Sequence, residues 1–312
     1  MEQLTRILVT GGHGFLGKAV CKRLSEDGYN HVIAIGSEHY NLTKEDAVKK
    51  LFDEKGPFDI VIHLAAALGG IGLIKEHPGK IYYENMIMNL LMQEKSRISN
   101  VSKFISIGSS RAYTEGIALP FKEEDLWKGY PEKTMAPYSL PKLSMLAQSQ
   151  FYKLQYEFNA IHLIFPNLYG PGYNIKSENP HVIPSLIKKF IRAKKDQEKE
   201  VIMWGSGNAT REFLYVDDAA EAIILALKKY NESEPLNIGF GEDITIKSLA
   251  EKIASILGYK GEIKWDKTKP EGQLKNVLDI SRAKKTIGFS AKTSLDEGLN
   301  KTISWFSKEL GF

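Results

Sequence analysis

The sequence predicts an α/β protein in which a Rossmann-type, doubly wound parallel sheet is joined to a smaller C-terminal substrate lobe. In the first half of the chain, short apolar segments alternate with longer segments of helical period, and a glycine-rich turn at residues 10–17 joins the first of each kind. Strands that are apolar on both faces belong to a parallel sheet that helices cover on its two sides.

Five apolar segments are expected to form strands of this sheet, at residues 7–9, 31–35, 60–64, 104–107 and 160–165. The segments between them carry apolar residues at helical spacing and are expected to form helices, near residues 15–28, 43–54, 79–98 and 136–158. We expect about seven strands in the whole sheet, as is usual for this fold class.

The rhythm of the sequence changes after residue 170, where Pro171, Pro180 and Pro184 interrupt a loop-rich region. Shorter elements are expected beyond it, with helices near 182–195, 216–229 and 247–257 and a strand near 200–204. We therefore divide the chain into a dinucleotide-binding domain, residues 1–170, and a substrate lobe, residues 171–312. Because no flexible linker separates them, the two parts are expected to interleave.

Composition excludes several classes of protein. Of 312 residues, 43% are apolar and 26% are charged, which is typical of globular proteins. No apolar run is long enough to span a membrane, the N-terminus has no signal-peptide pattern, and the single cysteine, Cys21, forms no intrachain disulfide or multi-cysteine metal site. The net charge of +4 includes no basic stripe, so we expect no nucleic-acid partner. From the single cysteine and the apolar runs we expect a cytoplasmic protein without a metal or a membrane partner.

The glycine-rich turn predicts a dinucleotide site. Gly11, Gly14 and Gly17 surround Phe15 and Leu16 between the first strand and the first helix. The first glycine permits a tight turn, the second lets the backbone approach a pyrophosphate, and the third allows close packing of helix on strand. The free N–H groups at the start of the helix then bind the anion.

The turn after the second strand favours NAD over NADP. It reads Gly-Ser-Glu-His at residues 36–39, so Ser37 and Glu38 lie where the adenosine ribose is bound, without a lysine or arginine for a 2′-phosphate. A carboxylate repels a phosphate but accepts a hydrogen bond from a ribose hydroxyl. The alternative is that Glu38 faces solvent and Ser37 with backbone groups accommodates either cofactor.

A Tyr-x-x-x-Lys pair indicates a redox centre. Tyr138 and Lys142 share one face of the predicted helix. A free tyrosine, with a pKa of about 10, is a poor base at neutral pH, and we expect the Lys142 ammonium and a nicotinamide cation to favour its phenolate form. Ser109 and Ser110 end the fourth strand, at the edge where parallel sheets bind ligands.

These motifs, with further segments, show that the chain resembles the nucleotide-sugar branch of the extended short-chain dehydrogenases/reductases, and within it the GDP-L-fucose synthase group. The further segments read His-Leu-Ala-Ala at 63–66 with Gly-Gly-Ile at 69–71, Pro-Asn-Leu-Tyr-Gly-Pro at 166–171, His-Val-Ile-Pro at 181–184, Trp-Gly-Ser-Gly at 204–207 and Arg-Glu-Phe-Leu-Tyr-Val-Asp-Asp at 211–218.

The resemblance implies a role for particular residues. Ser109, Tyr138 and Lys142 would be catalytic, together with His181. Residues lining the cofactor, besides those of the glycine loop and the second turn, would be Leu64, Ala65, Ala66, Ile107, Pro166, Asn167 and Leu168, with Tyr138 and Lys142. Residues binding a GDP-sugar would be Arg111, Asn167, His181, Lys189, Trp204, Arg211 and Asp279. For Trp204 the alternative is a core aromatic residue.

The sequence departs from the resembled group at one catalytic position. The epimerases of that group use a cysteine two residues beyond the catalytic serine, paired with a histidine; here Arg111 stands at the cysteine position and His181 remains. An arginine stays protonated and cannot relay protons. We therefore expect an NAD(H)-dependent oxidoreductase that acts at C4 of a GDP-activated manno-configured sugar, a heptose or a deoxyhexose, without 3,5-epimerase activity, in the synthesis of surface polysaccharide precursors.

Three other functions are weighed against this one. The main alternative is an NADPH-dependent GDP-L-fucose synthase, which would need another acid in place of the cysteine. A 4,6-dehydratase would need an acidic pair directly after Ser109, where the chain has Ser110 and Arg111. A cofactor-sensing protein without activity would have lost Tyr138 or Lys142, since function resides in the site and not in the fold.

The resemblance also implies a homodimer. The helices near 79–98 and 136–158 would meet their symmetry mates in a four-helix bundle. Ile87, Leu90 and Leu91 lie at a spacing suited to such an interface.

Overall fold

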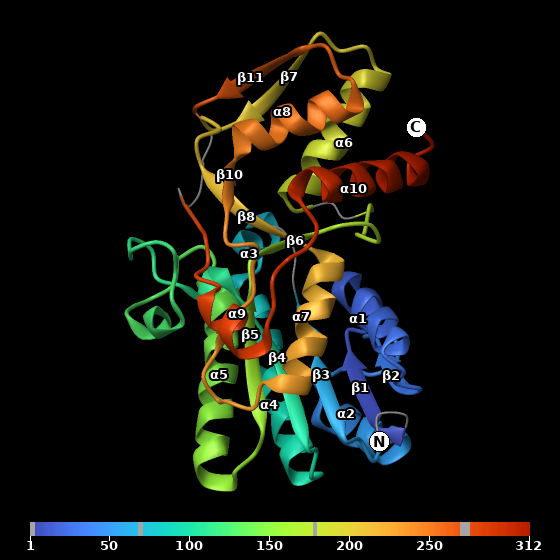
Figure 1. Ribbon diagram of the computed structural model, residues 1–312, viewed down its shortest axis with the longest axis vertical. Coiled ribbons are helices and arrows are strands. Elements are labelled where there is room, and N and C mark those ends of the chain that lie inside the picture. Colours follow the sequence, from blue (N-terminus) through green and yellow to red (C-terminus); the bar gives the residue numbers. More distant parts are fainter. Residues whose placement is uncertain (1–3, 68–70, 177–179, 269–274) are drawn as a thin grey trace.

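The computed structural model describes residues 4–67, 71–176, 180–268 and 275–312. Its centre is a six-stranded sheet with the strand order β2-β1-β3-β4-β5-β9, in which all neighbours are parallel (Figure 1). The strands are β1 (Arg6–Thr10), β2 (His31–Ile35), β3 (Ile60–His63), β4 (Lys103–Ser109), β5 (Ala160–Phe165) and β9 (Leu236–Asn237). The five predicted strands and the fold class are confirmed, and in the described residues the sheet has six strands where about seven were expected.

Helices cover both faces of this sheet, as strands with two apolar faces require. One face packs against α1 (Phe15–Glu26), α7 (Val216–Lys229) and the short α9 (Ser281–Ile287). The other packs against α2 (Glu45–Lys55), α4 (Pro78–Ile98) and α5 (Ala136–Tyr156). Each face has its own cluster of buried aliphatic and aromatic side chains, so the carboxyl edge of the sheet is held rigidly between two layers. The short α3 (Ile71–Glu76) precedes α4.

The second lobe lies beyond the carboxyl edge of the sheet, at the top of Figure 1. It holds a three-stranded sheet of β6 (Asn167–Tyr169), β8 (Thr210–Tyr215) and β10 (Asp243–Thr245), and a parallel pair of β7 (Glu200–Trp204) and β11 (Glu262–Asp266). Its helices are α6 (Val182–Lys195), α8 (Ile246–Leu257) and α10 (Leu295–Glu309). They share one apolar core with the strands.

The chain passes between the two lobes more than once. After β8 it returns to the large sheet with α7 and β9, and then crosses again to β10 and α8 (Figure 1). Consequently β8, which carries Arg211, is continued directly by a helix that packs on the large sheet. The two lobes are therefore tied by continuous secondary structure and not by a linker.

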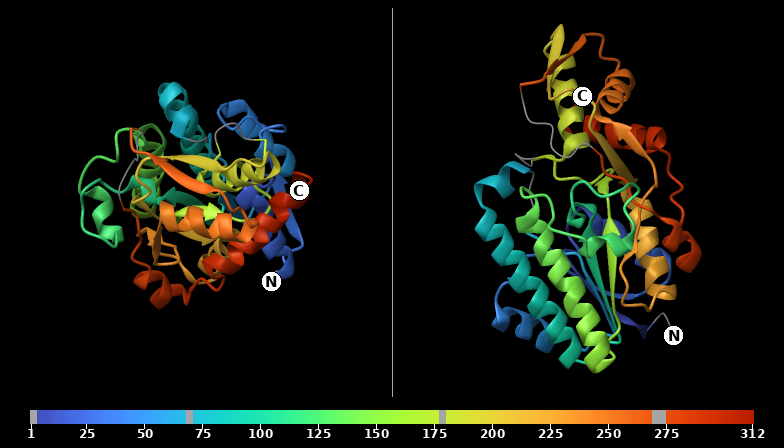
Figure 2. Two further views of the ribbon diagram at one scale, coloured as in Figure 1. Left: turned by 90° about the horizontal axis from the view of Figure 1, so that it is seen from above. Right: turned by 90° about the vertical axis from the view of Figure 1, so that its left-hand side faces the viewer.

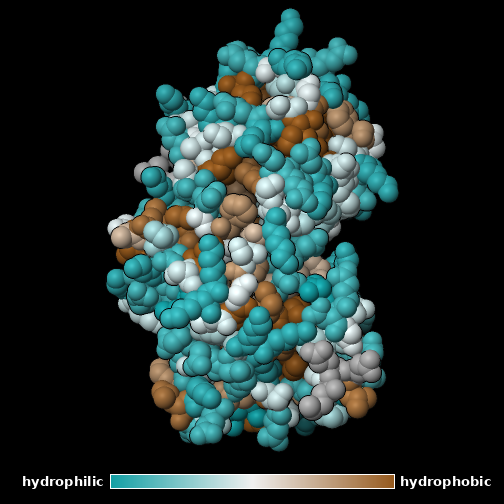
Figure 3. Space-filling view, viewed as in Figure 1, coloured by the Kyte–Doolittle hydropathy of each residue, from teal (hydrophilic) through white to brown (hydrophobic). Residues whose placement is uncertain are grey.

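The surface in Figure 3 is mainly hydrophilic, with small hydrophobic patches. In the described part of the chain, none of the helices combines the length and the apolar character that crossing a membrane requires.

Candidate active site

The glycine loop has no room for a side chain at Gly11 or Gly17. Gly11 has a φ of +66°, and a Cβ atom there would lie 2.9 Å from the backbone nitrogen of Ala65. A Cβ on Gly17 would lie 2.1 Å from the carbonyl oxygen of Gly11. The loop therefore folds tightly against the end of β3 and lets α1 begin close to the sheet, which is the geometry that a dinucleotide pyrophosphate needs.

The start of α1 offers hydrogen-bond donors. Gly14 is its N-cap residue and provides no side-chain acceptor to the first turn. The N–H groups of the first turn are directed beyond the carboxyl edge of the sheet, where an anion would be favoured. The residues present thus fit the pyrophosphate of a nicotinamide dinucleotide. Leu64, Ala65 and Ala66 directly follow β3 beside the loop, whereas Gly69 and Gly70 lie outside the described residues.

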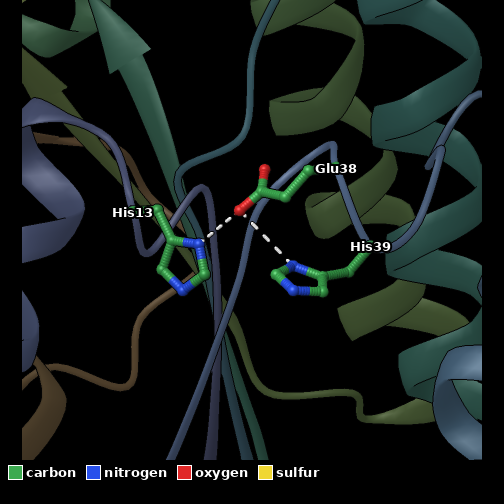
Figure 4. A group of neighbouring side chains, drawn as sticks. All are labelled: His13, Glu38 and His39. Atoms are coloured by element: carbon green, nitrogen blue, oxygen red, sulfur yellow. Dashed lines mark hydrogen bonds and ion pairs between the residues drawn. The ribbon is translucent and has the colours of Figure 1, made fainter.

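The carboxylate of Glu38 lies between two imidazole rings (Figure 4). Its Oε1 is 2.5 Å from Nδ1 of His13 and 3.4 Å from Nδ1 of His39. The hydrogen bond with His13 lowers the pKa of Glu38. The three donor atoms, all exposed, lie within 4.8 Å of one another and are of types that ligate transition metals. Glu38 and His39 follow the carboxyl end of β2, where the adenosine ribose was predicted, so a carboxylate and two imidazoles stand at that position.

Tyr138 and Lys142 lie one turn apart on α5, and both are buried. The Lys142 Nζ is 5.8 Å from the centre of the Tyr138 ring. Burial raises the pKa of Tyr138 to about 12 and lowers that of Lys142 to about 8. Desolvation is the cause of the raised Tyr138 pKa, and the expectation that Lys142 and a bound nicotinamide cation together favour the phenolate stays a prediction. The Tyr138 phenol is protonated at neutral pH and is suited to donate a proton.

Ser109 is the last residue of β4, and a short 3₁₀ turn follows it. Its Oγ accepts a hydrogen bond of 3.2 Å from the backbone N–H of Arg111, which caps the 3₁₀ turn Ser110–Ala112. The Ser139 hydroxyl donates to the Arg111 carbonyl oxygen at 2.9 Å. Since Ser139 follows Tyr138 directly, these bonds hold Ser109 and Arg111 in a fixed place relative to α5.

Arg111, His181 and Arg211 come from three different elements and are close enough to influence one another's charge. Burial lowers the pKa of His181, and the charge of Arg111 lowers it further. Burial and the Arg111 charge together bring the pKa of Arg211 to about 10. Among the described residues, Glu132 is a carboxylate whose charge raises the pKa of both Arg111 and Arg211, although burial lowers both more strongly. A site rich in positive charge is suited to an anionic ligand such as a diphosphate.

The other predicted ligand residues occupy the small lobe and its border. Trp204 on β7 is 68% exposed, so the alternative of a core aromatic residue is wrong. Lys189, on α6, donates to the carbonyl oxygen of Ile202. Asn167 Nδ2 donates to the carbonyl oxygen of Glu212 at 3.1 Å. Asp279 accepts a 2.9 Å bond from the Ser281 N–H, and hydrogen bonds from the Ser281 side chain and backbone lower the pKa of Asp279.

One hollow of the surface lies apart from the predicted site residues. A hollow of about 440 Å³ lies at the far end of the small lobe, lined by Lys194, Glu198 and Tyr259 among others. None of the predicted site residues lines it.

Asn276 is a residue that sequence reasoning missed. Its side chain is fully buried, and neither its amide nitrogen nor its amide oxygen has a hydrogen-bond partner. Its backbone oxygen accepts from the N–H of Glu212, next to Arg211. Two residues further on, Leu278 bridges to Phe121 and packs in one buried cluster with Ala112, on the turn that carries Arg111. No local pattern marks it, since an asparagine in a loop is common.

Glu212 likewise has no predicted role of its own and belongs to the Arg-Glu-Phe segment that starts at residue 211. Its carboxylate accepts 2.8 Å bonds from the N–H groups of Gly241 and Leu278. Burial raises its pKa to about 7 despite these bonds. Glu212 thereby attaches the segment that carries Asn276 and Asp279 to β8.

The parallel sheet with its glycine loop, together with the Tyr138–Lys142 pair at the same edge, defines a Rossmann-fold oxidoreductase of the short-chain dehydrogenase/reductase class. The model of the NAD dependent epimerase/dehydratase family matches residues 7–239, and the chain belongs to this family of NAD(P)-dependent enzymes.

Individual relatives narrow the similarity. The chain is 33% identical over 310 residues to GDP-L-fucose synthase from Escherichia coli (strain K12), covering 96% of each chain. A GDP-mannoheptose C4 reductase from Campylobacter jejuni with NADP bound has a TM-score of 0.89 and 27% identity, covering 98% of this chain and 99% of that one. A GDP-L-fucose synthetase from Naegleria fowleri bound to NADP has a TM-score of 0.89 and 26% identity, covering 100% and 96%. The predicted resemblance is confirmed.

Proposed function

We propose that the protein is an NAD(P)H-dependent oxidoreductase that acts at C4 of a GDP-activated manno-configured sugar and that it lacks 3,5-epimerase activity. The names of its relatives support GDP-sugar chemistry. The observation that carries the finer proposal is the intact Tyr138–Lys142 pair beside Arg111, which stands where the resembled epimerases have a cysteine. A role in surface polysaccharide precursors is part of the same proposal.

The proposed chemistry follows from the positions of the polar groups. The nicotinamide, when bound, supplies or accepts the hydride at C4. Tyr138, which its raised pKa keeps protonated at neutral pH, donates its proton to the C4 oxygen in the reducing direction. Ser109 orients that oxygen from the end of β4, and Lys142 holds the ribose next to the nicotinamide with its ammonium group.

The absence of epimerisation follows from the charges of two groups. Inversion at C3 and C5 needs one group that removes a proton and another that returns one on the opposite face. His181 is neutral near pH 7, because burial and the Arg111 charge lower its pKa, and it can only accept a proton. Arg111 keeps its proton even where burial lowers its pKa, because an arginine starts from a very high value. The second group of the relay is therefore missing.

We propose that the anionic part of the substrate is bound from both lobes. Arg211 and Lys189 bind the diphosphate, and Trp204 offers an exposed flat surface to the nucleoside. Asp279 and the unpaired amide of Asn276 bind the ribose or the base. Arg111 binds hydroxyl groups of the sugar, since it lies on the turn next to Ser109.

The choice of cofactor has two opposed arguments. The exposed carboxylate of Glu38 favours NAD, while two solved neighbours hold NADP. The structure adds His13 and His39, which bind Glu38 and would meet a 2′-phosphate if that carboxylate turned outward. We propose NADP(H) as the working cofactor, with NAD(H) bound more weakly. Fluorescence titration with NADPH and NADH tests this directly, and tighter binding of NADH would restore the expectation from Glu38 alone.

We also propose a homodimer formed through α4 and α5. The two helices lie side by side on an outer face of the molecule (Figure 2, right). Their exposed side chains include Tyr83, Leu90, Phe151 and Leu154, an unusual amount of apolar surface for a helix pair facing water. Ile87 is partly buried, and Leu91 packs against the core behind the sheet and so faces inward.

One experiment decides between the proposed activity and its main alternative. The enzyme is incubated in D₂O with NADPH and either GDP-4-keto-6-deoxymannose or the 4-keto form of a GDP-manno-heptose. Hydride transfer is followed by nicotinamide absorbance, and exchange at C3 and C5 by NMR against a sample without enzyme. We expect reduction at C4 without enzyme-dependent exchange. Exchange at both carbons would show an epimerase/reductase of the GDP-L-fucose synthase type.

A further inference from the structure

Buried polar groups form a continuous chain of hydrogen bonds from the glycine loop to the catalytic helix. The Oγ1 of Thr10 lies 2.8 Å from Nδ1 of His63, and Nε2 of His63 lies 3.2 Å from Oδ1 of Asn89. The Nδ2 of Asn89 then donates to the carbonyl oxygen of Pro141 at 3.1 Å. Thr10, His63 and Asn89 are at most 1% exposed.

The partners fix the direction of every bond. The carbonyl oxygen of Pro141 can only accept, so it faces the NH₂ group of Asn89, whose oxygen is turned to His63. Since that oxygen also only accepts, His63 must carry its proton on Nε2. Its Nδ1 therefore accepts from the Thr10 hydroxyl. Burial and the charge of Lys142 lower the pKa of His63 to about 3, which keeps this single neutral tautomer.

The two ends of this hydrogen-bond chain lie at the two parts of the predicted redox site. Thr10 directly precedes Gly11, and its Oγ1 also accepts from the N–H of Ala65 at 3.3 Å, within the predicted cofactor lining. Pro141 directly precedes Lys142. Because proline has no N–H, α5 lacks one helical hydrogen bond at this turn. Asn89 binds the helix from α4 at this weakened turn.

We propose that Thr10, His63 and Asn89 are positioning residues that hold Lys142 in register with the cofactor-binding loop. None of the three needs to touch the sugar. The hydrogen-bond chain is uncharged and shielded from water, so it fixes geometry without competing with Lys142 for a proton. The proposal rests on the proposed role of Lys142, and for its primary readout only on the binding of a nicotinamide cofactor.

The test compares variants that break the chain with one that preserves it. Thr10→Val is nearly isosteric and removes the hydroxyl, Thr10→Ser retains it, and Asn89→Leu removes both bonds of the amide. Ser149→Ala is the matched control, because Ser149 is fully buried in the same α4–α5 interface and hydrogen-bonds Gln93, two turns from Lys142. Cofactor dissociation constants are measured without sugar, and kcat, KM and Tm are measured for the same samples.

We expect Thr10→Val and Asn89→Leu to weaken cofactor binding and lower kcat by about tenfold, with an unchanged KM for the sugar. Thr10→Ser stays within about twofold of the unaltered enzyme. The double variant Thr10→Val/Asn89→Leu should bind cofactor no more weakly than the poorer single variant, because one broken bond already disconnects the hydrogen-bond chain. Ser149→Ala lowers the Tm to a similar extent and leaves cofactor binding and kcat unchanged.

Two results would overturn the proposal. One is unchanged cofactor binding in folded Thr10→Val and Asn89→Leu, and the other is an equal loss in Ser149→Ala, which would indicate general loosening of the α4–α5 interface. If the unaltered enzyme reduces none of the GDP-4-keto sugars, the proposed function fails, and the cofactor titrations still decide whether the chain positions Lys142.

Discussion

Tyr138 is the residue on which the proposed chemistry depends most directly. Tyr138→Phe should lower hydride transfer by about 10²–10⁴-fold, because the phenol is the proton donor. Cofactor binding should change little, since the ring remains to fill its buried place. Tyr156→Phe is the control, because Tyr156 is at the exposed end of the same helix. Activity retained in Tyr138→Phe would contradict the mechanism.

Lys142 gives the site a pH dependence. Burial lowers its pKa to about 8, so the ammonium is present below that pH and lost as the pH rises through it. If the ammonium binds the cofactor ribose, affinity is full at the lower pH and falls above pH 8. NADPH titrations one pH unit below and one above this value should differ several-fold, whereas Lys142→Met should bind weakly and equally at both. An equal fall in Lys142→Met would assign the effect to another group.

Asn276 should show opposite effects on stability and on binding. A buried amide without partners costs free energy, so Asn276→Leu should raise the free energy of unfolding by about 1–3 kcal/mol. If the amide binds the nucleotide, the same change should weaken GDP binding. Denaturant unfolding and calorimetry with GDP measure the two quantities. Greater stability with unchanged GDP affinity would leave Asn276 without a role in recognition.

At the scale of elements, the start of α1 tolerates a side chain at Gly14 better than at Gly17. A Cβ at position 17 would lie 2.1 Å from a backbone oxygen, while a Cβ at position 14 would lie 3.1 Å from the nearest atom at an ordinary φ of −78°. Gly17→Ala should therefore lower the free energy of unfolding by about 1–3 kcal/mol and weaken NADPH binding strongly.

The matched variant Gly14→Ala separates packing from ligand contact. It should retain most of the stability, because the helix needs no special conformation there. Thermal unfolding and NADPH titration of both variants provide the comparison. Equal destabilisation would mean that the tight helix–strand approach at Gly17 relaxes more easily than its geometry indicates.

At the scale of the whole molecule, the exposed apolar face of α4 and α5 predicts the assembly. Phe151 and Leu154 are 66% and 82% exposed on one side of α5. Phe151→Glu would place a charge in the centre of the proposed four-helix bundle and should yield a monomer. Trp127→Glu, at another exposed apolar site, should leave the dimer intact. Sedimentation at micromolar concentration distinguishes the outcomes, and a monomeric unaltered protein would exclude this interface.

The crossings of the chain between the lobes would let the proposed site draw on residues of both. Ser109 and Tyr138 belong to the large sheet and its helix layer, whereas Arg211 lies on β8 of the small lobe. Because α7 follows β8 directly and packs on the large sheet, Arg211 is held relative to Tyr138 by continuous structure. A substitution in the core of α7 is therefore expected to affect both parts of the site.

The local sequence pattern was sufficient to predict the central sheet and the two motifs at its edge. The buried strands, the Gly11–Gly17 loop and the Tyr138–Lys142 pair depend on spacing within a few residues, and such spacing determines which faces meet. The resemblance to GDP-sugar enzymes likewise rested on short contiguous segments. These features could be predicted before any contact was known.

Only the tertiary structure decided the charges and contacts between distant segments. The raised pKa of Tyr138, the lowered pKa of His181, the Glu38 carboxylate between two imidazoles and the unpaired amide of Asn276 all depend on burial and on neighbours far along the chain. Spacing along the chain does not report desolvation or the field of a remote charge, because both arise only when the chain has folded. The sequence by itself determined the sheet, the loop and the Tyr138–Lys142 pair, and the fold decided their protonation and their partners.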